Sequence, residues 1–216
     1  MTVFNPYRTW GSPLARRVVW DLSHHSWRAR RALKNLRNSH GGECAVILCN
    51  GPSLNKVNFE ELDGIYTFGL NKINLLFDRV DFRPSSIVAV NPYVIEQNRD
   101  FYNQTNIPLF LDSIAVKKRI GIRPNTTFIH TGGYGFAKDC SITVPKGHTV
   151  TYVAMQLAFH MGFDRVALVG ADHYFNTQGS ANKLVVSGRE DRDHFDPRYF
   201  SGGVNWQLPD LFESEM

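Results

Sequence analysis

The architecture of this chain follows from one stretch, Cys44-Ala45-Val46-Ile47-Leu48-Cys49-Asn50-Gly51-Pro52-Ser53. Its first six residues are all apolar, as in a strand that is buried on both faces of a parallel sheet. The four residues that follow are of the kinds that end a strand and turn the chain. We therefore expect a central buried strand that runs directly into a polar turn.

Five further segments are apolar and of strand length. A helical pattern precedes the last of them, because Val153, Leu157 and Met161 fall on one face of residues 149–161, and Gly162 follows. Alternating strands and helices are typical of a mainly parallel sheet with helices on both faces. We expect such a Rossmann-like α/β fold, with strands at residues 66–70, 86–90, 108–111, 126–130 and 165–169.

The charge is distributed unevenly along the 216 residues. Residues 1–40 hold eight Arg or Lys side chains and one Asp, a net charge of +7. Since the whole chain has a net charge of +4, the net charge of residues 41–216 is −3. A chain of this length fits one domain with appendages. We divide it into a basic N-terminal helical extension, residues 1–42, and a Rossmann-like domain, residues 43–216. The sequence leaves open a C-terminal continuation of that domain.

The basic extension has two interpretations. Between Pro13 and Leu36 its arginines alternate with apolar residues, so part of it could form an amphipathic helix. Through residues 13–37 such a helix could contact an anionic membrane surface, or it could pack on the domain with its arginines in solvent. We expect no nucleic-acid partner, because the remaining chain is acidic and carries no recognition motif.

No apolar run approaches the roughly 20 residues that a membrane-spanning helix needs, and the start of the chain does not resemble a secretory signal. We therefore expect a cytoplasmic protein, which the extension could hold at the inner membrane surface. The three cysteines, Cys44, Cys49 and Cys140, show no C-x-x-C spacing, which argues against a disulfide framework and a zinc site. We expect them to serve as small hydrophobic side chains.

Asparagine follows three of the expected strands, at Asn50, Asn71 and Asn91. In open parallel sheets, ligands bind outside the carboxyl ends of the strands, and an amide side chain can pair with a nucleobase, a ribose or a sugar hydroxyl. Asparagine is also a common turn residue, so a structural role stays open for each. The turn after Cys49 is neither a Walker loop nor a G-x-G-x-x-G motif, although Gly51 would let backbone amides approach an anion.

Chemically active side chains occur mainly toward the C-terminal end. His173 and His194 lie in segments that we expect at the same edge of the sheet, and either imidazole could act as a general base or be structural. The Asp191-Arg192-Asp193 triplet could bind a metal ion, but charged surface runs of this kind are common. The polar segment 176–193 precedes His194 and is typical of a lid over a binding site.

These motifs occur in the order seen in a known group of proteins. The chain resembles the family 42 bacterial sialyltransferases. It is equally similar to the related MptE-like proteins (domain of unknown function 115), which include flagellin-glycosylating motility accessory factors and an archaeal pterin pyrophosphokinase. The resemblance implies a Rossmann-like sheet in a variant of the glycosyltransferase GT-A fold. It covers roughly residues 43–200 and rests on Cys49-Asn50-Gly51-Pro52-Ser53-Leu54, Asn71, Asn91-Pro92, the helix 149–162 and Leu168-Val169-Gly170-Ala171-Asp172-His173-Tyr174.

The resemblance also implies roles for residues. Tyr174 matches a tyrosine that binds the donor phosphate, and His194 is the nearest match to a lid histidine that serves as general base, with His173 as the alternative. No metal and no cofactor are implied, since the CMP-linked nucleotide sugar is a substrate. Val150 stands where the sialyltransferases have a small Ser-Gly pair, which favours the MptE-like branch. The implied donor-binding residues are Asn50, Gly51, Pro52, Ser53, Asn71, Asn91, Thr149, Thr151, Gly170, Asp172 and His173.

The strand-end residues and the resemblance together favour a glycosyltransferase-like enzyme of polysaccharide biosynthesis. Residues 43–216 would bind a nucleotide sugar and transfer its sugar, such as a sialic-acid-like one, to a hydroxyl of a glycan or glycoprotein acceptor. One alternative is a Mg²⁺-dependent pterin pyrophosphokinase of the MptE type, with Asp172, Asp191 and Asp193 as candidate metal ligands. Another alternative is a noncatalytic scaffold in envelope polysaccharide assembly.

Overall fold

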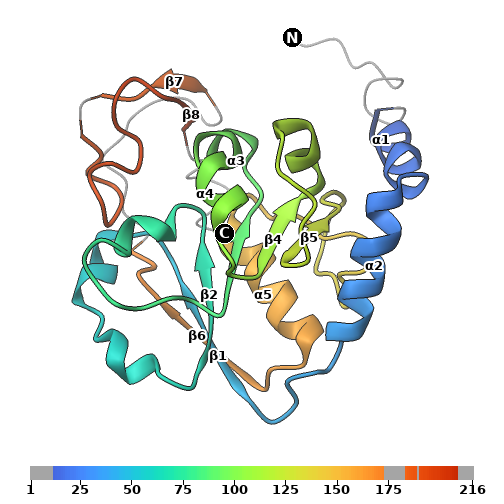
Figure 1. Ribbon diagram of the computed structural model, residues 1–216, viewed down its shortest axis with the longest axis horizontal. Coiled ribbons are helices and arrows are strands. Elements are labelled where there is room, and N and C mark those ends of the chain that lie inside the picture. The colour runs from blue at the N-terminus through green and yellow to red at the C-terminus, as the bar shows by residue number, and fades with distance from the viewer. Residues whose placement is uncertain (1–11, 173–182, 189, 209–216) are drawn as a thin grey trace.

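The computed structural model describes residues 12–172, 183–188 and 190–208. Its centre is a six-stranded sheet in the order β5-β4-β3-β2-β1-β6, in which every neighbouring pair is parallel (Figure 1). The predicted Rossmann-like α/β fold is therefore confirmed, and each expected strand lies within one residue of its observed bounds. These bounds are Cys44–Leu48 (β1), Tyr66–Leu70 (β2), Ser86–Ala89 (β3), Leu109–Asp112 (β4), Thr126–Ile129 (β5) and Arg165–Val169 (β6).

The sheet separates two hydrophobic cores, because side chains alternate across each strand. Along β1 and the residue after it, Val46 and Leu48 point into one core, while Ala45, Ile47 and Cys49 point into the other. All five are buried, which agrees with the continuous apolar run in the sequence. The first core is covered by the short helices η2 (Pro52–Lys56), η3 (Phe59–Leu62), η4 (Ile73–Leu76), α3 (Pro92–Gln97), α4 (Arg99–Gln104) and η5 (Ser113–Lys118).

The second core is covered by α5 (Val150–Met161), which connects β5 to β6. Thr149 caps the start of this helix, since its side chain accepts a hydrogen bond from the Thr151 amide at 3.2 Å. Gly162 ends the helix with a left-handed φ of 88°, as the sequence predicts. Because α5 carries the chain back past β1, the strand order reverses between β1 and β6.

The basic N-terminal segment forms two helices, α1 (Ser12–Asp21) and α2 (His24–Leu36), with Ser23 capping the second. α2 lies along β5 at the edge of the sheet (Figure 1). Ala29 belongs to the first core and Leu33 to the second, so α2 is part of the folded domain and shields an otherwise open strand edge. Among the described helices, none combines the length and apolar character that crossing a membrane requires.

The backbones of β1 and β6 approach each other closely where both strands end. The Cys49 amide donates to the Val169 carbonyl at 2.8 Å, and the Gly51 amide donates to the Gly170 carbonyl at 2.9 Å. A Cβ on Gly51 would lie 2.2 Å from Asp172 Oδ2 and 2.7 Å from the Gly170 carbonyl oxygen. Glycine is therefore required at position 51, and the turn after β1 is fixed against the turn after β6.

The last described segment, residues 190–208, crosses the carboxyl ends of the strands and reaches α3 (Figure 1). The Phe195 amide donates to the Asn50 carbonyl at 2.9 Å, and the Gln97 side chain donates to the Asn205 carbonyl at 2.8 Å. Part of the expected lid forms β7 (Leu184–Val186), which pairs antiparallel with β8 (Asn205–Gln207). Residues 176–182 and 189 of that lid lie outside the described residues.

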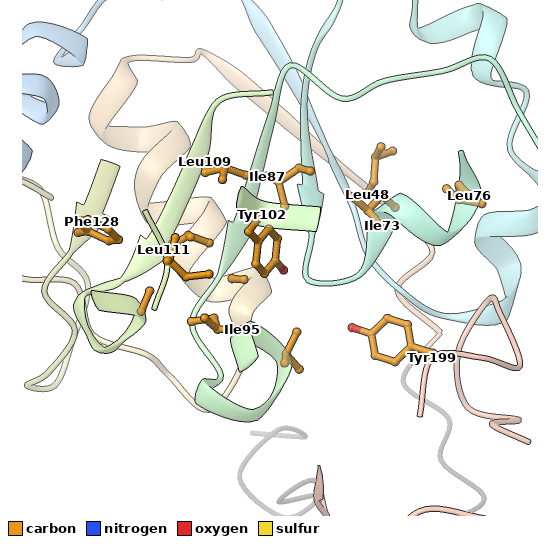
Figure 2. Close-up of a cluster of buried hydrophobic side chains, with 14 of the residues drawn as sticks. Leu48, Ile73, Leu76, Ile87, Ile95, Tyr102, Leu109, Leu111, Phe128 and Tyr199 are labelled. Carbon is orange, nitrogen blue, oxygen red and sulfur yellow. The ribbon is translucent and has the colours of Figure 1, made fainter. Parts of the chain in front are cut away.

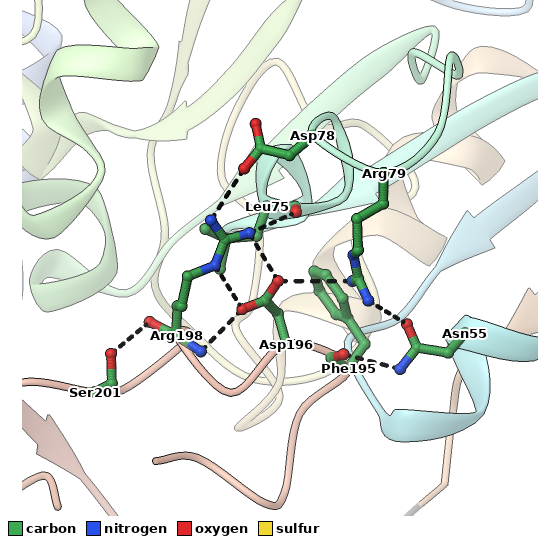
Figure 3. A network of polar contacts seen from close by, with 8 residues as sticks. All are labelled: Asn55, Leu75, Asp78, Arg79, Phe195, Asp196, Arg198 and Ser201. Carbon is green, nitrogen blue, oxygen red and sulfur yellow. Dashed lines mark hydrogen bonds and ion pairs between the residues drawn. The ribbon is translucent and has the colours of Figure 1, made fainter. Parts of the chain in front are cut away.

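A network of charged side chains holds the same segment against η4 (Figure 3). Arg198 Nε donates to Asp196 Oδ1 at 2.9 Å, Nη1 to Asp78 Oδ2 at 3.0 Å, and Nη2 to the Leu75 carbonyl at 3.1 Å. Arg79 lies 3.6 Å from Asp196 Oδ2. Burial raises the pKa of the Asp196 carboxyl, but its hydrogen bonds with Arg198 outweigh burial and hold that pKa below its ordinary value of 3.8.

Aromatic packing adds to this attachment. Tyr199 is 1% exposed and inserts into the first core, where Leu48 and Ile73 also lie (Figure 2). Phe195 and Phe200 are buried in the same core and contact the Tyr199 ring edge to face. Burying a side chain of this size stabilises a fold by about 1.5–3 kcal/mol, so residues 190–208 are held by packing as well as by charge.

Gly51→Ala should lower the free energy of unfolding by about 1–3 kcal/mol, because the added methyl group overlaps tightly packed atoms. Chemical denaturation of the two proteins measures the change. Gly41→Ala is the matched control, since no atom lies within 4 Å of a Cβ at that position, and its effect should stay below about 0.5 kcal/mol. Equal losses in the two variants would contradict the close approach of β1 and β6.

Asp196→Asn should destabilise the protein at neutral pH, because Arg198 and Arg79 lose the carboxylate that they share. The pKa of Asp196 is lowered in the folded state, so its stabilising contribution is present above 3.8 and is lost as the pH falls through the folded-state pKa. Urea unfolding at about pH 7 and about pH 3 should therefore show a smaller difference between the two proteins in acid. Asp63→Asn, at an exposed site, serves as control. A difference that did not depend on pH would refute this account of the network.

Candidate active site

The carboxyl ends of β1 and β2 hold two buried hydrogen-bond acceptors. The side-chain oxygens of Asn50 and Asn71 are shielded from solvent and have no hydrogen-bond partner among the described residues. Asn71 has a left-handed φ of 50°, as a turn residue can, and its carbonyl accepts from the Tyr102 hydroxyl at 2.8 Å. An unpaired buried acceptor costs about 1–3 kcal/mol, so both side-chain oxygens are suited to a ligand that supplies donors.

The next two strand ends are already paired within the chain. Asn91 caps α3, because its side-chain oxygen accepts hydrogen bonds from the Tyr93 and Val94 amides. Asp112 ends β4 and is 2% exposed, and its carboxylate lies 2.9 Å from Lys146 Nζ. The oxygen of Asn91 thus serves the turn, and only the amide group of this side chain remains for a ligand.

The backbone amides of the turn after β1 donate hydrogen bonds to the turn after β6. The Ser53 amide donates to Asp172 Oδ2 at 2.7 Å, and the Gly51 amide donates to the Gly170 carbonyl. Pro52 begins η2 and has no amide hydrogen. These five predicted donor-binding residues are therefore close together, but an anionic ligand would have to displace Asp172 to reach the Ser53 amide.

The N-terminus of α5 lies beside the same turn. Thr151, in the first turn of the helix, has its Oγ1 3.6 Å from Cys49 Sγ, while Thr149 caps the helix. Free amide hydrogens and the helix dipole favour an anion at this position. Burial raises the pKa of the Cys49 thiol, so the sulfur adds no negative charge beside the helix. All three cysteines of the chain are free thiols. The two predicted threonines thus lie where a donor carboxylate or phosphate could bind.

His194 and Asp191 form a histidine–carboxylate pair at this edge of the sheet. His194 Nδ1 lies 2.8 Å from Asp191 Oδ2, and the imidazole stacks on Tyr199 with ring centroids 3.9 Å apart. Phe195 follows directly and donates to the Asn50 carbonyl, which brings the pair to the end of β1. No described residue bonds to Nε2 of His194. Such a pair fixes the tautomer of the imidazole and leaves Nε2 to take a proton.

Asp191 is held as a carboxylate by several donors. Besides His194, it accepts from the Phe200 amide at 3.1 Å and the Asp193 amide at 2.9 Å. Burial raises its pKa, but the hydrogen bond to His194 and the amide bonds hold that pKa below the ordinary value. Asp191 therefore orients a histidine. In the described parts of the chain, no three His, Cys, Asp or Glu side chains gather as a metal site would require.

Lys72 is a buried cation that sequence reasoning did not single out. Its Nζ donates to the Tyr199 carbonyl at 2.5 Å and to Gln97 Oε1 at 2.7 Å, and it lies 5.0 Å from the centre of the Phe200 ring. Burial lowers the pKa of this amine to about 8. Lys72 directly follows Asn71 at the end of β2. The rule that ligands bind outside the carboxyl ends of parallel strands, which points to Asn71, could therefore have identified Lys72 too.

Some contacts of the site could not be predicted from the sequence, and the roles of two predicted residues remain predictions. Asp112 directly follows an apolar strand, but nothing in the sequence indicates that Lys146 neutralises it. The sequence suggests a metal ligand or a surface charge at Asp191, although its spacing of three residues from His194 permits the observed contact. His173 and Tyr174 lie outside the described residues, so their predicted roles stay predictions.

A hollow of about 960 Å³ lies at the opposite edge of the sheet, near the amino ends of β1 and β2. Glu43, Tyr66 and Arg83 are among its lining residues. It contains none of the unpaired acceptors at the strand ends and no part of the histidine–carboxylate pair. In open parallel sheets ligands bind at the carboxyl ends of the strands, so we assign the candidate active site to those ends and not to this hollow.

Comparison with known proteins identifies the family of this chain. A family model described as 6-hydroxymethylpterin diphosphokinase MptE-like matches residues 23–178. The match begins at the cap of α2, includes all six strands of the parallel sheet and ends just after β6. Comparisons with curated proteins and with solved structures gave no match. Since the match spans well over half of the chain, the predicted MptE-like relationship is confirmed, and this chain belongs to the 6-hydroxymethylpterin diphosphokinase MptE-like family.

Proposed function

We propose that this protein transfers a sugar from a nucleotide-activated donor to a hydroxyl of a glycan or glycoprotein acceptor, with a CMP-linked sugar as the first candidate donor. The observation that carries the proposal is the His194–Asp191 pair, 2.8 Å apart, at the end of β1. A histidine oriented by a carboxylate is suited to remove the proton of a hydroxyl group. The unpaired oxygens of Asn50 and Asn71 at neighbouring strand ends suit a nucleoside.

In this proposal the nucleoside binds at Asn50 and Asn71. Their side-chain oxygens can accept hydrogen bonds from ribose hydroxyls or from the amino group of cytosine. Because these atoms are shielded from solvent, a ligand reaches them only if the chain around them moves. Residues 190–208 are the element that would move, and the hydrogen bond from Phe195 to the Asn50 carbonyl would break as they do so. In this proposal residues 190–208, which overlap the predicted lid of residues 176–193 only at its end, act as the lid.

The proposed chemistry begins when Nε2 of His194 removes the proton of the acceptor hydroxyl. The freed oxygen attacks the anomeric carbon of the donor sugar, and the bond between that carbon and the phosphate oxygen breaks. The electron pair of the broken bond leaves with CMP, whose new negative charge is stabilised by the N-terminus of α5 beside Thr149 and Thr151. Asp191 stabilises the imidazolium that forms. Tyr174 keeps its predicted role at the donor phosphate.

The family description favours a second candidate, transfer of diphosphate from ATP to a pterin hydroxyl. The same base could serve, but this reaction requires Mg²⁺, which carboxylates hold. We prefer sugar transfer because three carboxylates at this edge are already engaged within the chain, Asp112 with Lys146, Asp172 with the Ser53 amide and Asp191 with His194.

His194→Ala should lower the rate of transfer by about 100- to 10,000-fold, the usual contribution of a general base. Nucleotide affinity should be retained, because the imidazole acts on the acceptor. Steady-state kinetics and calorimetric titration measure the two quantities separately. His24→Ala is the control, since His24 is exposed at the start of α2, and it should transfer at the full rate. Full activity in His194→Ala would show that another group is the base.

Calorimetric titration with CMP, UDP, GDP and ATP, each with and without Mg²⁺, separates the candidate functions. Sugar transfer predicts metal-independent binding of CMP, which Asn50→Ala weakens about tenfold through the loss of one hydrogen bond. Asn35→Ala, at an exposed position of α2, should leave that affinity unchanged. Binding of ATP only with Mg²⁺ would favour the pterin diphosphokinase, and binding of no nucleotide would favour a noncatalytic scaffold.

A further inference from the structure

The two N-terminal helices present an apolar stripe to solvent. Leu14, Val18 and Leu22 follow one another at four-residue spacing along α1 and its end, so they lie on one face. They are 64%, 54% and 82% exposed, Val19 beside them is 67% exposed, and Trp27 of α2 is 73% exposed. We call these five residues the apolar stripe. Large apolar side chains gathered on one exposed face indicate an interaction site.

The stripe is not a core surface that failed to pack, because both helices already bury their opposite faces. Trp20 of α1 is 8% exposed and stacks on His130, with ring centroids 6.0 Å apart. Ala29 and Leu33 of α2 are buried in the two cores. The domain therefore fixes the helices in place and directs the apolar stripe away from itself.

Exposed cationic side chains lie on the same two helices as the apolar stripe. Arg17 and Arg30 pair with Asp21, but Arg16 and Arg31 are exposed and have no ion-pair partner among the described residues. Lys34 is likewise exposed on α2. With a net charge of +7 in residues 1–40 against −3 in the rest of the chain, an anionic partner is attracted to this end of the molecule in particular.

We propose that the apolar stripe and the exposed cations on the same helices bind the surface of an anionic lipid bilayer. The aliphatic side chains would enter the boundary between headgroups and acyl chains, Trp27 would lie at the level of the headgroups, and Arg16, Arg31 and Lys34 would contact lipid phosphates. A protein partner would explain the apolar residues, but the exposed cations on the same helices match a negatively charged, extended surface better.

This orientation would bring the candidate active site toward the bilayer. His130, on which Trp20 stacks, directly follows β5, so α1 lies at the carboxyl ends of the strands (Figure 1). The His194–Asp191 pair lies at the same edge of the sheet, near the end of β1. An acceptor carried by a membrane lipid could then reach the site without leaving the surface.

The test is cosedimentation of the full chain with two kinds of vesicle, phosphatidylcholine alone and equal parts of phosphatidylcholine and phosphatidylglycerol. Binding should occur to the anionic vesicles and weaken as salt is added. Replacing Arg16 and Arg31 by Ala should weaken it about fivefold for each arginine removed. Val18→Asp with Leu22→Asp should weaken binding about tenfold or more, because the apolar residues can no longer enter the bilayer.

Two variants serve as matched controls. Lys117→Ala removes an exposed cation within η5, and Val186→Asp changes an apolar residue of β7 that is 68% exposed. Both should bind like the parent protein, and circular dichroism should show that all variants fold, since the changed side chains are exposed. Equal binding to both kinds of vesicle, or no loss in the stripe variant, would overturn the proposal. A third result would also overturn it: analytical ultracentrifugation shows a self-associated chain, Leu22→Asp dissociates it, and the protein does not bind vesicles.

Discussion

The candidate site depends on the close approach of two turns, one after β1 and one after β6. Gly51 and Gly170 make this approach possible, since a Cβ on either would overlap backbone oxygens of the other strand's turn. The strand order reverses between these two strands, and in open parallel sheets ligands bind at such a point, outside the carboxyl ends of the strands. The N-terminus of α5, Asn50 and the segment that carries His194 all lie near this point.

The geometry of the proposed base depends on contacts far from it in the sequence. His194 lies on a segment that Tyr199 anchors in the first core and that Arg198 ties to Asp78 and Leu75. The same segment bonds to the Asn50 carbonyl at the end of β1. Tertiary packing thus sets the position of the imidazole, while Asp191 sets its orientation. In the proposed function, this segment closes over the ligand and also carries the proposed general base.

The sequence predicted the sheet well because each strand is an apolar run bounded by turn residues, and α5 has clear start and stop signals at Thr149 and Gly162. It also predicts a site at the carboxyl ends of the strands, which is where we place the candidate site. It could not separate the roles of the three asparagines, because ligand-binding and turn asparagines have the same pattern. Asn91 proved to cap a helix, while Asn50 and Asn71 keep unpaired oxygens.

The contacts that complete the site are long-range and leave no local signal. Lys72 meets the Tyr199 carbonyl, and Lys146 neutralises Asp112, only because the fold brings these segments together. The acidic triplet at residues 191–193 is compatible with a metal site or with a charged surface run, and in the structure Asp191 accepts hydrogen bonds from His194 and two backbone amides. Residue type alone does not distinguish a carboxylate that binds a metal from one that orients a histidine.

Hydrogen–deuterium exchange of the intact protein with and without CMP tests the location of the site most directly. The account predicts slower exchange of backbone amides in residues 50–54, in the first turn of α5 and in residues 190–200, because the nucleotide and the closed segment would shield them. Protection confined to the hollow at the opposite edge of the sheet, around residues 57–67 and 80–85, would contradict a nucleotide site at the ends of β1 and β6.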